Sequence, residues 1–397
     1  MQALGRLGLR LAEPGEFTRR AFLNGKLDLL QAEAIADLAA AETEAQLRQA
    51  LRQLDGELGN LYRDWSGRLT RVLAHLEAAI DFPDEDLPPE IEDRIGGETE
   101  ELLGEIERHL ADGRRGERLR DGISVAIVGP PNAGKSSLLN RIARREAAIT
   151  SPIPGTTRDV IEVAIDLQGY PVVLADTAGL RDSSDEIERE GRRRAVQRAE
   201  EAEIRLFVYD ASHLTEAAGA AAWPGPDTIL VANKIDLLPR RALSARGRAH
   251  SVMPAPGRPA PAGRPGGDPG IYGSIAGVAE NMDGRDMPGY DGERLALPQE
   301  TISVSALTGQ GVDSLLMALG ERVAENYRVE APTLTRARHR QALEEATAAL
   351  RRSLAAPLTE LRAEDLRLAL RSLGRITGSV GVEDLLDVIF RDFCIGK

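Results

Sequence analysis

The stretch Ile127-Val128-Gly129-Pro130-Pro131-Asn132-Ala133-Gly134-Lys135-Ser136-Ser137 decides the fold of this chain. An apolar run from Val125 to Val128 leads into the loop and predicts a short buried strand, and the residues after the loop have helical spacing. The loop itself has the pattern G-x-x-x-x-G-K-S, whose glycines let backbone N–H groups surround a polyphosphate at a helix N-terminus. Lys135 is expected to reach the terminal phosphates, and Ser136 to offer its hydroxyl to Mg²⁺. This stretch therefore predicts a nucleotide-binding α/β domain.

The lysines support this prediction. Of the 50 Lys and Arg residues only four are lysine, at positions 26, 135, 234 and 397. Because arginine is the usual basic residue in this chain, a lysine suggests a site that needs a compact ammonium group and not a planar guanidinium group. Lys135 and Lys234 fall in nucleotide-binding motifs, so Lys26 and Lys397 become candidates for a second function.

Composition excludes several classes of protein. No apolar run is long enough for a membrane span and no signal peptide opens the chain, so we expect no membrane association. The single cysteine, Cys394, rules out an intramolecular disulfide framework and fits the cytoplasm. A net charge of −13 argues against nucleic-acid binding by the whole surface, so any RNA contact must use local basic patches.

Periodicity divides the 397 residues into four segments. Residues 26–120 have apolar residues at three- and four-residue steps, and the part up to Asp81 predicts one long helix or a helical hairpin. Residues 121–330 alternate strand-like and helix-like runs, as in a parallel sheet covered on both faces. Residues 331–397 return to helical periodicity. We expect the two helical flanks to form one bundle into which the α/β domain is inserted, while residues 1–25 are the remnant of an N-terminal α+β domain.

Two segments interrupt this pattern. Residues 240–298 are rich in Pro and Gly and predict a disordered insertion, with a functional basic arm as the alternative. The acidic cluster Phe82–Pro89 predicts a solvated turn, with cation binding as the alternative.

Further motifs follow the phosphate loop in the order typical of GTPases. Asp176 ends a strand-like run and is placed to hold Mg²⁺ through water, with the N–H of Gly179 directed at the γ-phosphate. Thr157 can supply a second hydroxyl to Mg²⁺ from a nucleotide-sensing loop. The segment Asn233-Lys234-Ile235-Asp236 favours GTP over ATP, because an aspartate can accept two hydrogens from guanine but no such pair from adenine. Ser305-Ala306-Leu307 resembles the loop that contacts the guanine oxygen through backbone N–H groups.

These motifs do not identify the catalytic residue. Ras-like enzymes carry a glutamine after D-x-x-G that orients the attacking water. Here Leu180 stands at that position, and its side chain cannot form a hydrogen bond. Either hydrolysis is slow, or an acidic residue downstream replaces the glutamine. Composition does not choose among Asp182, Asp185, Glu186, Glu188 and Glu190.

Motifs throughout the chain resemble the MnmE (TrmE) family of tRNA-modification GTPases. They are Pro14-Gly15-Glu16-Phe17-Thr18, Ala21-Phe22-Leu23-Asn24-Gly25-Lys26-Leu27-Asp28, Gln31-Ala32-Glu33-Ala34-Ile35, Ala78-Ala79-Ile80-Asp81-Phe82, Gly155-Thr156-Thr157-Arg158-Asp159, Asp176-Thr177-Ala178-Gly179-Leu180-Arg181 and Phe393-Cys394-Ile395-Gly396-Lys397. The resemblance implies a Ras-like P-loop GTPase domain inserted into an all-α helical bundle. It also implies K⁺-dependent GTP hydrolysis, together with a flavoprotein of the MnmG type, to add an aminomethyl or carboxymethylaminomethyl group to C5 of the wobble uridine in tRNA. The GTPase domains are expected to dimerise on binding nucleotide.

The resemblance also implies site residues. The water-orienting glutamate matches Glu188, and the K⁺ ligands match Asn132, Ser151, Ile153 and Thr156. The residues expected to bind GTP are Asn132, Ala133, Gly134, Lys135, Ser136, Ser137, Ser151, Pro152, Ile153, Pro154, Gly155, Thr156, Thr157, Asp176, Thr177, Ala178, Gly179, Asn233, Lys234, Ile235, Asp236, Ser305, Ala306 and Leu307.

A folate site is implied as well. The family binds 5-formyl- or methylene-tetrahydrofolate in an N-terminal domain that dimerises the protein, and Lys26 and Lys397 match folate-contacting positions. Only residues 1–25 of that domain are expected here, so this pocket and the constitutive dimer would be incomplete. Cys394 matches a residue considered mechanistic in the family. A buried cysteine at a helix end is the alternative, and a C-a-a-X prenylation signal fits poorly.

Two other functions compete with the modifying GTPase. One is a ribosome-assembly GTPase, but neither a second GTPase domain nor a GXXG-bearing RNA-binding module follows the first. The other is a nucleotide-regulated scaffold without turnover. A comparison of GTP turnover in K⁺ and in Na⁺ separates the scaffold from the enzyme.

Overall fold

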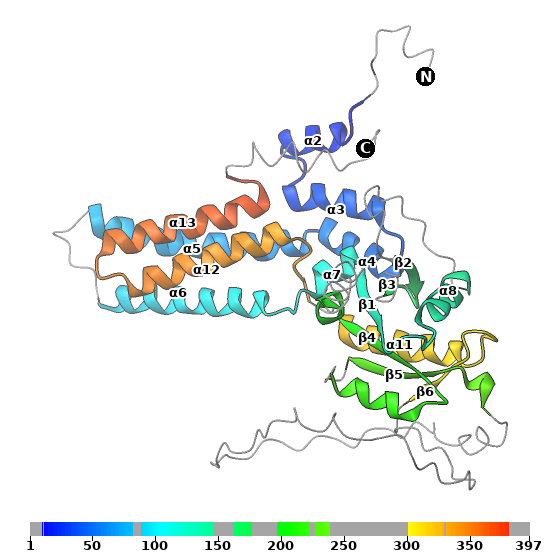
Figure 1. The fold of residues 1–397 in the computed structure, drawn as a ribbon. Helices are drawn as coiled ribbons and strands as arrows, with labels where there is room; N and C mark the ends of the chain where they lie inside the picture. The colour runs from blue at the N-terminus through cyan, green and yellow to red at the C-terminus, as the bar shows by residue number, and fades with distance from the viewer. Residues whose placement is uncertain are drawn as a thin grey trace, which may run out of the picture.

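The computed structural model describes residues 10, 12–81, 89–145, 162–176, 197–222, 225, 227–238, 301–328 and 331–380. In these residues a sheet lies beside a long helical bundle (Figure 1). The sheet belongs to the middle of the chain, and the bundle to both flanks.

The sheet has six strands in the order β2-β3-β1-β4-β5-β6. Their bounds are β1 (Ile123–Val128), β2 (Glu162–Leu167), β3 (Tyr170–Asp176), β4 (Ile204–Asp210), β5 (Thr228–Asn233) and β6 (Ile302–Ser303). The hairpin partners β2 and β3 are antiparallel, and every other pair is parallel. The carboxyl ends of β1, β3, β4 and β5 therefore lie at one edge, where sheets of this kind bind ligands.

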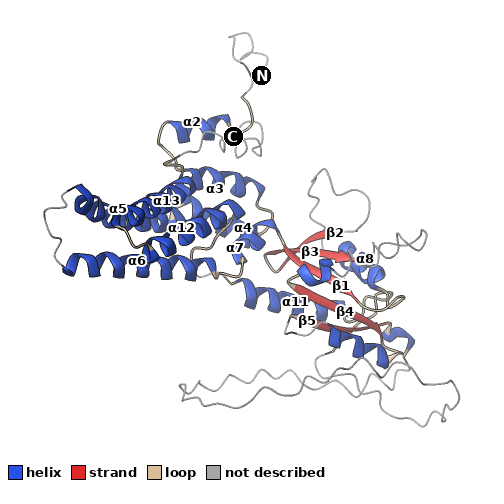
Figure 2. Ribbon diagram, turned by 60° about the vertical axis from the view of Figure 1, so that its left-hand side comes forward, coloured by secondary structure: helices blue, strands red, loops and turns tan. Residues whose placement is uncertain are grey.

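Apolar residues cover both faces of the sheet. Helices flank the sheet in Figure 2. On one face, strand residues pack against α8 (Lys135–Arg145) and α11 (Val312–Tyr327). On the other face they pack against Ala199 and Ala202 and against the 3-10 helix η1 (Leu214–Ala222). Burial on both faces explains why the central strands β1 and β4 are largely apolar and do not alternate.

The bundle combines both flanks of the chain. Its helices are α3 (Leu29–Ala40), α4 (Glu44–Leu54), α5 (Glu57–Asp81), α6 (Pro89–Leu110), α12 (Ala337–Ala355) and α13 (Thr359–Thr377). One apolar core joins Trp65 and Leu69 of α5 to Leu343 of α12 and Leu366 of α13, although hundreds of positions separate them in the sequence. The expected fold class, an α/β P-loop domain inserted into an all-α bundle, is confirmed.

The prediction of one long helix or a hairpin before Asp81 is wrong, because this part forms three helices. Thr43 starts α4 with a capping box to Gln46, and Gly56 makes the turn before α5 with φ 90°. Before these three helices, α2 (Glu16–Leu23) begins directly after Gly15.

The helical stretch before the sheet is also divided. It forms α6 and α7 (Arg115–Asp121), separated by positive φ angles at Gly113 and Arg114. Strands β3 and β5 end at the polar residues Asp176 and Asn233, whereas β6 has only two residues.

Other predictions of organisation lie outside the described residues. They concern residues 82–88, the insertion 240–298 and the apolar residues 385–389. The domain limits at 25/26, 120/121 and 330/331 stay predictions, although α7 itself runs one residue past 120.

A cluster of charged residues ties the entry and exit of the inserted domain to the bundle, and we call it the interdomain joint. Asp37 of α3 accepts hydrogen bonds from Arg120 of α7, at 2.9 Å, and from Arg336 before α12, at 2.7 Å. Arg340 of α12 donates to Glu117 of α7 at 2.7 Å. The segments that lead into and out of the sheet are thus held by common partners.

Glu33 of α3 also belongs to this joint and is 1% exposed. Arg338 donates to both of its carboxylate oxygens, at 2.6 and 2.7 Å, and Nε2 of His339 lies 2.9 Å from one of them. Burial acts to raise the pKa of Glu33, but its partners His339 and Arg338 outweigh burial and lower the pKa. Burial and the charge of Arg338 lower the pKa of His339, so its imidazole is neutral at pH 7.

Candidate nucleotide site

The phosphate loop connects the end of β1 to the start of α8. Gly129 and Gly134 have φ of 138° and 91°, values that residues with side chains rarely adopt. A Cβ atom at Gly129 would collide with the carbonyl of Val208 in β4, and one at Gly134 would collide with the side chain of Asn233. Packing as well as the turn therefore requires both glycines.

Lys135 is the first residue of α8 and is 6% exposed. Its ammonium group donates to the carbonyls of Gly129 and Pro130, at 2.8 and 2.7 Å, so it lies against the loop. Asn132, in the same loop, is exposed and has φ 62°, a conformation that asparagine tolerates better than most residues. Ala133 is buried, whereas Ser137 is exposed.

Two oxygen-bearing side chains meet beside the lysine. Ser136 donates a short hydrogen bond to Asp176, which ends β3 and is 1% exposed. The register of β1 and β3 pairs Ile127 with Asp176, which brings the carboxylate to the loop. A hydroxyl and one carboxylate fit Mg²⁺, which takes oxygen ligands and is usually held by one or two carboxylates together with substrate phosphates. In keeping with this sparse set, the described residues contain no group of three or more His, Cys, Asp or Glu that could hold a metal alone.

Asn233 at the end of β5 links the phosphate loop to the loop after β6. Its amide nitrogen donates to the Ala133 carbonyl at 2.8 Å, and its oxygen accepts from the Ala306 N–H at 3.0 Å. Asn233 is 1% exposed, and both polar ends of its side chain form hydrogen bonds to protein groups. This residue therefore fixes the distance between the two loops.

Lys234 has a left-handed φ of 63° and directs its ammonium group to Asp210 at the end of β4, at 2.8 Å. Burial acts to raise the pKa of Asp210, but hydrogen bonds from Lys234 and Ser212 outweigh burial and hold the pKa at about 2. The ion pair anchors the lysine side chain across adjacent strands.

Asp236 and Ser305 complete this edge of the sheet. The Ser305 hydroxyl donates to the Asp236 carboxylate at 2.5 Å and accepts from the N–H of Thr308 at 3.1 Å. Ile235, which precedes Asp236, is buried in the core, so any contact it makes with a nucleotide would use its backbone.

Arg141 of α8 holds the loop after β6 from the other side. It donates to the carbonyl of Ala306, at 2.9 Å, and to that of Leu307. Since α8 begins at Lys135, one helix positions both the phosphate loop and the loop expected to contact the base.

Part of the predicted site lies outside the described residues. This part comprises Ser151, Pro152, Ile153, Pro154, Gly155, Thr156, Thr157, Thr177, Ala178, Gly179 and Glu188, together with Lys397 and Cys394. Lys26 is described and is exposed in the turn after α2, where its backbone N–H donates to the Ala21 carbonyl at 2.9 Å.

Sequence reasoning did not identify Asp210 or Arg141. Asp210 could have been found, because it ends a strand next to the one that ends at Asn233. Arg141 carried no such signal, because its partners are backbone carbonyls more than a hundred positions away.

Comparisons with known proteins show what this chain is similar to. The family described as "MnmE helical domain" matches residues 29–394. A Parvibaculum lavamentivorans protein named "tRNA modification GTPase MnmE" is 51% identical over 403 residues, which cover 100% of this chain and 79% of that protein. A human protein named "5-taurinomethyluridine-[tRNA] synthase subunit GTPB3, mitochondrial" is 43% identical over 416 residues, which cover 100% of this chain and 75% of that protein.

Solved structures are more distant. A GTP-binding protein of Sulfolobus solfataricus in complex with GDP is 14% identical with a TM-score of 0.28, covering 70% of this chain and 71% of that one. Among the described residues, no helix is both long and apolar enough to cross a membrane. The family match and the 51% identity along the whole chain show that it belongs to the MnmE family of tRNA modification GTPases.

Proposed function

We propose that this GTPase requires K⁺ and acts with an MnmG-type flavoprotein to add an aminomethyl or carboxymethylaminomethyl group to C5 of the wobble uridine of tRNA. Hydrolysis of GTP in tRNA modification is the activity for which its family is named. The name of the human relative denotes a 5-substituted uridine in tRNA, which supports C5 as the position. The single cysteine of the chain agrees with a cytoplasmic location.

The observation that carries the proposal is the double use of Asn233. Because its side chain bonds both Ala133 and Ala306, the phosphate loop and the base loop form one frame. A ligand that fills this frame has a polyphosphate at one end and a purine at the other. Asp236 is attached to the same frame through Ser305 and supplies the carboxylate that guanine needs.

The residues of the frame divide the work of hydrolysis. Lys135 would bind the terminal phosphate oxygens. Ser136 and Thr157 would offer their hydroxyls to Mg²⁺, and Asp176 would hold the ion through water. Mg²⁺, when bound, neutralises charge that develops on the phosphates. Glu188 orients the attacking water in place of the missing glutamine.

Asn132, with Ser151, Ile153 and Thr156, binds K⁺ beside the phosphates in this proposal. A cation there supplies a positive charge like that of an arginine finger, which is worth about 10³–10⁵ in rate. The GTPase domains of two chains pair across the nucleotide. Folate binding at Lys26 and Lys397 is proposed from the family pattern alone.

The test is GTP turnover at equal concentrations of K⁺ and Na⁺. We expect turnover in K⁺ to be faster by at least about tenfold, because the alkali cation acts on charge formed in the transition state. Glu188→Ala should keep the affinity for GTP and lose turnover, whereas Glu190→Ala, the matched control, should behave like the unchanged protein. Equal turnover in both salts would reject the K⁺ site, and no turnover in either would favour a scaffold.

A further inference from the structure

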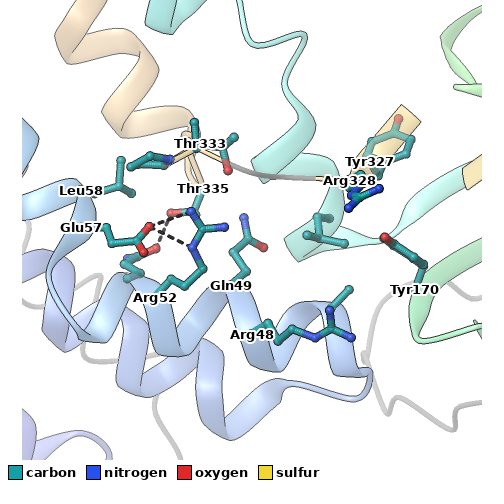
Figure 3. Close-up of a pocket in the computed structure, with 15 residues that line it drawn as sticks. Arg48, Gln49, Arg52, Glu57, Leu58, Tyr170, Tyr327, Arg328, Thr333 and Thr335 are labelled. Atoms are coloured by element: carbon teal, nitrogen blue, oxygen red, sulfur yellow. Dashed lines mark hydrogen bonds and ion pairs between the residues drawn. The ribbon is translucent and has the colours of Figure 1, made fainter. Parts of the chain in front are cut away.

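A hollow of about 330 Å³ lies between the bundle and the sheet domain (Figure 3). Its walls are α4 and the start of α5, Tyr170 at the start of β3, the end of α11, and the segment Ala331–Thr335 that leads back to the bundle. Arg48 and Arg52 reach it from α4, and Arg328 reaches it from the end of α11. Both parts of the molecule thus contribute arginine to one hollow.

A second hollow of about 720 Å³ shares part of this lining. The common residues are Arg328 and Ala331–Thr333, and the other walls include Arg108 of α6 and Arg115 of α7. The two hollows are therefore neighbours along the returning segment. We call them together the joint furrow.

The lining of the joint furrow is basic although the chain has a net charge of −13. Five arginines line it: Arg48, Arg52, Arg108, Arg115 and Arg328. The three carboxylates in the lining are each paired, namely Glu57 with Arg52 at 2.8 Å, Glu105 with Arg68 at 2.8 Å and Asp112 with Arg340 at 2.7 Å. The acidic side chains therefore do not cancel the positive charge of the other arginines.

Two of these arginines are easily recruited by a ligand. Arg115 is exposed and makes no ion pair with any described residue. The side chain of Arg48 is 68% exposed, and among the described residues its ion pair is with Glu44, one turn away and 65% exposed. Such surface pairs contribute little and exchange readily for a stronger anion.

The chemistry points to phosphates held on a chain. A guanidinium group recognises phosphate with two parallel hydrogen bonds. The arginines do not converge on one point but are distributed over two neighbouring hollows, which suits a polyanion better than a single small anion. We propose that the joint furrow binds the sugar–phosphate backbone of tRNA, with Arg48, Arg115 and Arg328 as phosphate contacts. This inference rests on tRNA being the substrate in the proposed function.

The experiment measures the affinity of the full chain for tRNA as a function of salt concentration. For Arg48→Gln with Arg115→Gln, two exposed positions whose change should not disturb folding, we expect binding weaker by on the order of tenfold at low salt. The slope of log affinity against log salt should fall by about one for each arginine removed. Adding Arg328→Gln should lower the slope again. The control is Arg71→Gln with Arg352→Gln, which removes the same charge at residues that line neither hollow.

The outcomes separate this inference from the proposed function. If the unchanged chain does not bind tRNA, the proposed substrate is wrong and the furrow proposal falls with it. If the unchanged chain binds and the furrow variant has the slope of the control variant, the furrow proposal alone is wrong. If the furrow variant loses binding of inorganic phosphate but keeps that of tRNA, the furrow takes a small phosphate compound and the proposal is also overturned. GTP turnover of the same samples should not change, since neither position lies in the nucleotide site.

Discussion

The nucleotide edge of the sheet and the interdomain joint are held together by different chemistry. At the edge, one side chain typically bonds the backbone of a neighbouring loop, as Asn233 and Arg141 do. In the joint, arginines meet buried carboxylates, as Arg338 meets Glu33 and Arg336 meets Asp37. The first arrangement positions loops around a ligand, and the second holds segments that are distant in the sequence. Damage at the edge should therefore change which ligand is accepted, and damage in the joint should change the stability of the whole fold.

The largest expected effect is the loss of guanine selectivity at the edge. In Asp236→Asn, one hydrogen-bond acceptor for guanine becomes an amide donor, which opposes the amino group of the base. We expect kcat/KM for GTP to fall by about 10⁴, a factor typical of a site left with unpaired polar groups. Xanthosine triphosphate, which carries a carbonyl where guanine has its amino group, should become the better substrate.

This prediction also sharpens the comparison between the two regions. The free energy of unfolding of Asp236→Asn should change little, because the asparagine oxygen can still accept the hydrogen bond from Ser305. Steady-state kinetics with GTP and with xanthosine triphosphate test the change of substrate. Urea denaturation tests the unchanged stability. Retained preference for GTP would show that the base is read elsewhere.

The next largest effect is expected in the joint, from Glu33→Gln. The substitution keeps the shape of the side chain but leaves Arg338, whose guanidinium bonds both carboxylate oxygens, without its counter-charge. Removing one partner of a buried ion pair costs about 3–5 kcal/mol. We expect the urea midpoint to fall accordingly, while KM for GTP stays unchanged in the folded protein.

The control for this variant is Glu107→Gln. Glu107 pairs with Arg351 at 2.7 Å, but their side chains are 39% and 64% exposed, so the pair should contribute less than about 1 kcal/mol. Equal losses of stability in the two variants would mean that the joint is no stronger than an ordinary surface pair.

The two regions also differ in how far they could be predicted from the sequence. The phosphate loop and Asn233-Lys234-Ile235-Asp236 are short, local patterns with special backbone needs, so their placement at one edge followed from the parallel strands. Glu33 and Arg338 are 305 positions apart, and each belongs to a helix where charged residues usually face solvent. Only the folded bundle brings them together. The division of residues 29–81 into three helices was missed for a different reason: a capping box and one glycine, both local signals, interrupt an apolar period that looks unbroken.

The smallest effect we predict is a difference in pH dependence. His339 is 0% exposed, and its pKa is lowered from 6.5 to about 4, first by burial and then by the charge of Arg338. In the unfolded chain the imidazole binds a proton as the pH falls below 6.5, whereas the folded protein binds it only near pH 4. Acid therefore favours the unfolded state across this window. Between pH 7 and pH 5 we expect His339 to account for a loss of about 2 kcal/mol in the free energy of unfolding.

The nucleotide edge should not respond in that range. The pKa of Asp210 is lowered from 3.8 to about 2, so its pair with Lys234 is fully present above pH 4 and weakens only as the pH falls toward 2. Urea denaturation at pH 7, 6 and 5 gives the free energy of unfolding at each pH. For His339→Gln, which keeps a hydrogen-bond donor for Glu33 but does not titrate, this free energy should fall less steeply with falling pH. His75→Gln, at an exposed position, should keep the full slope. If the free energy of unfolding of His339→Gln falls with pH as steeply as that of the unchanged protein, the joint is not the acid-sensitive part of the fold. The two regions would then differ in ligand binding but not in their response to acid.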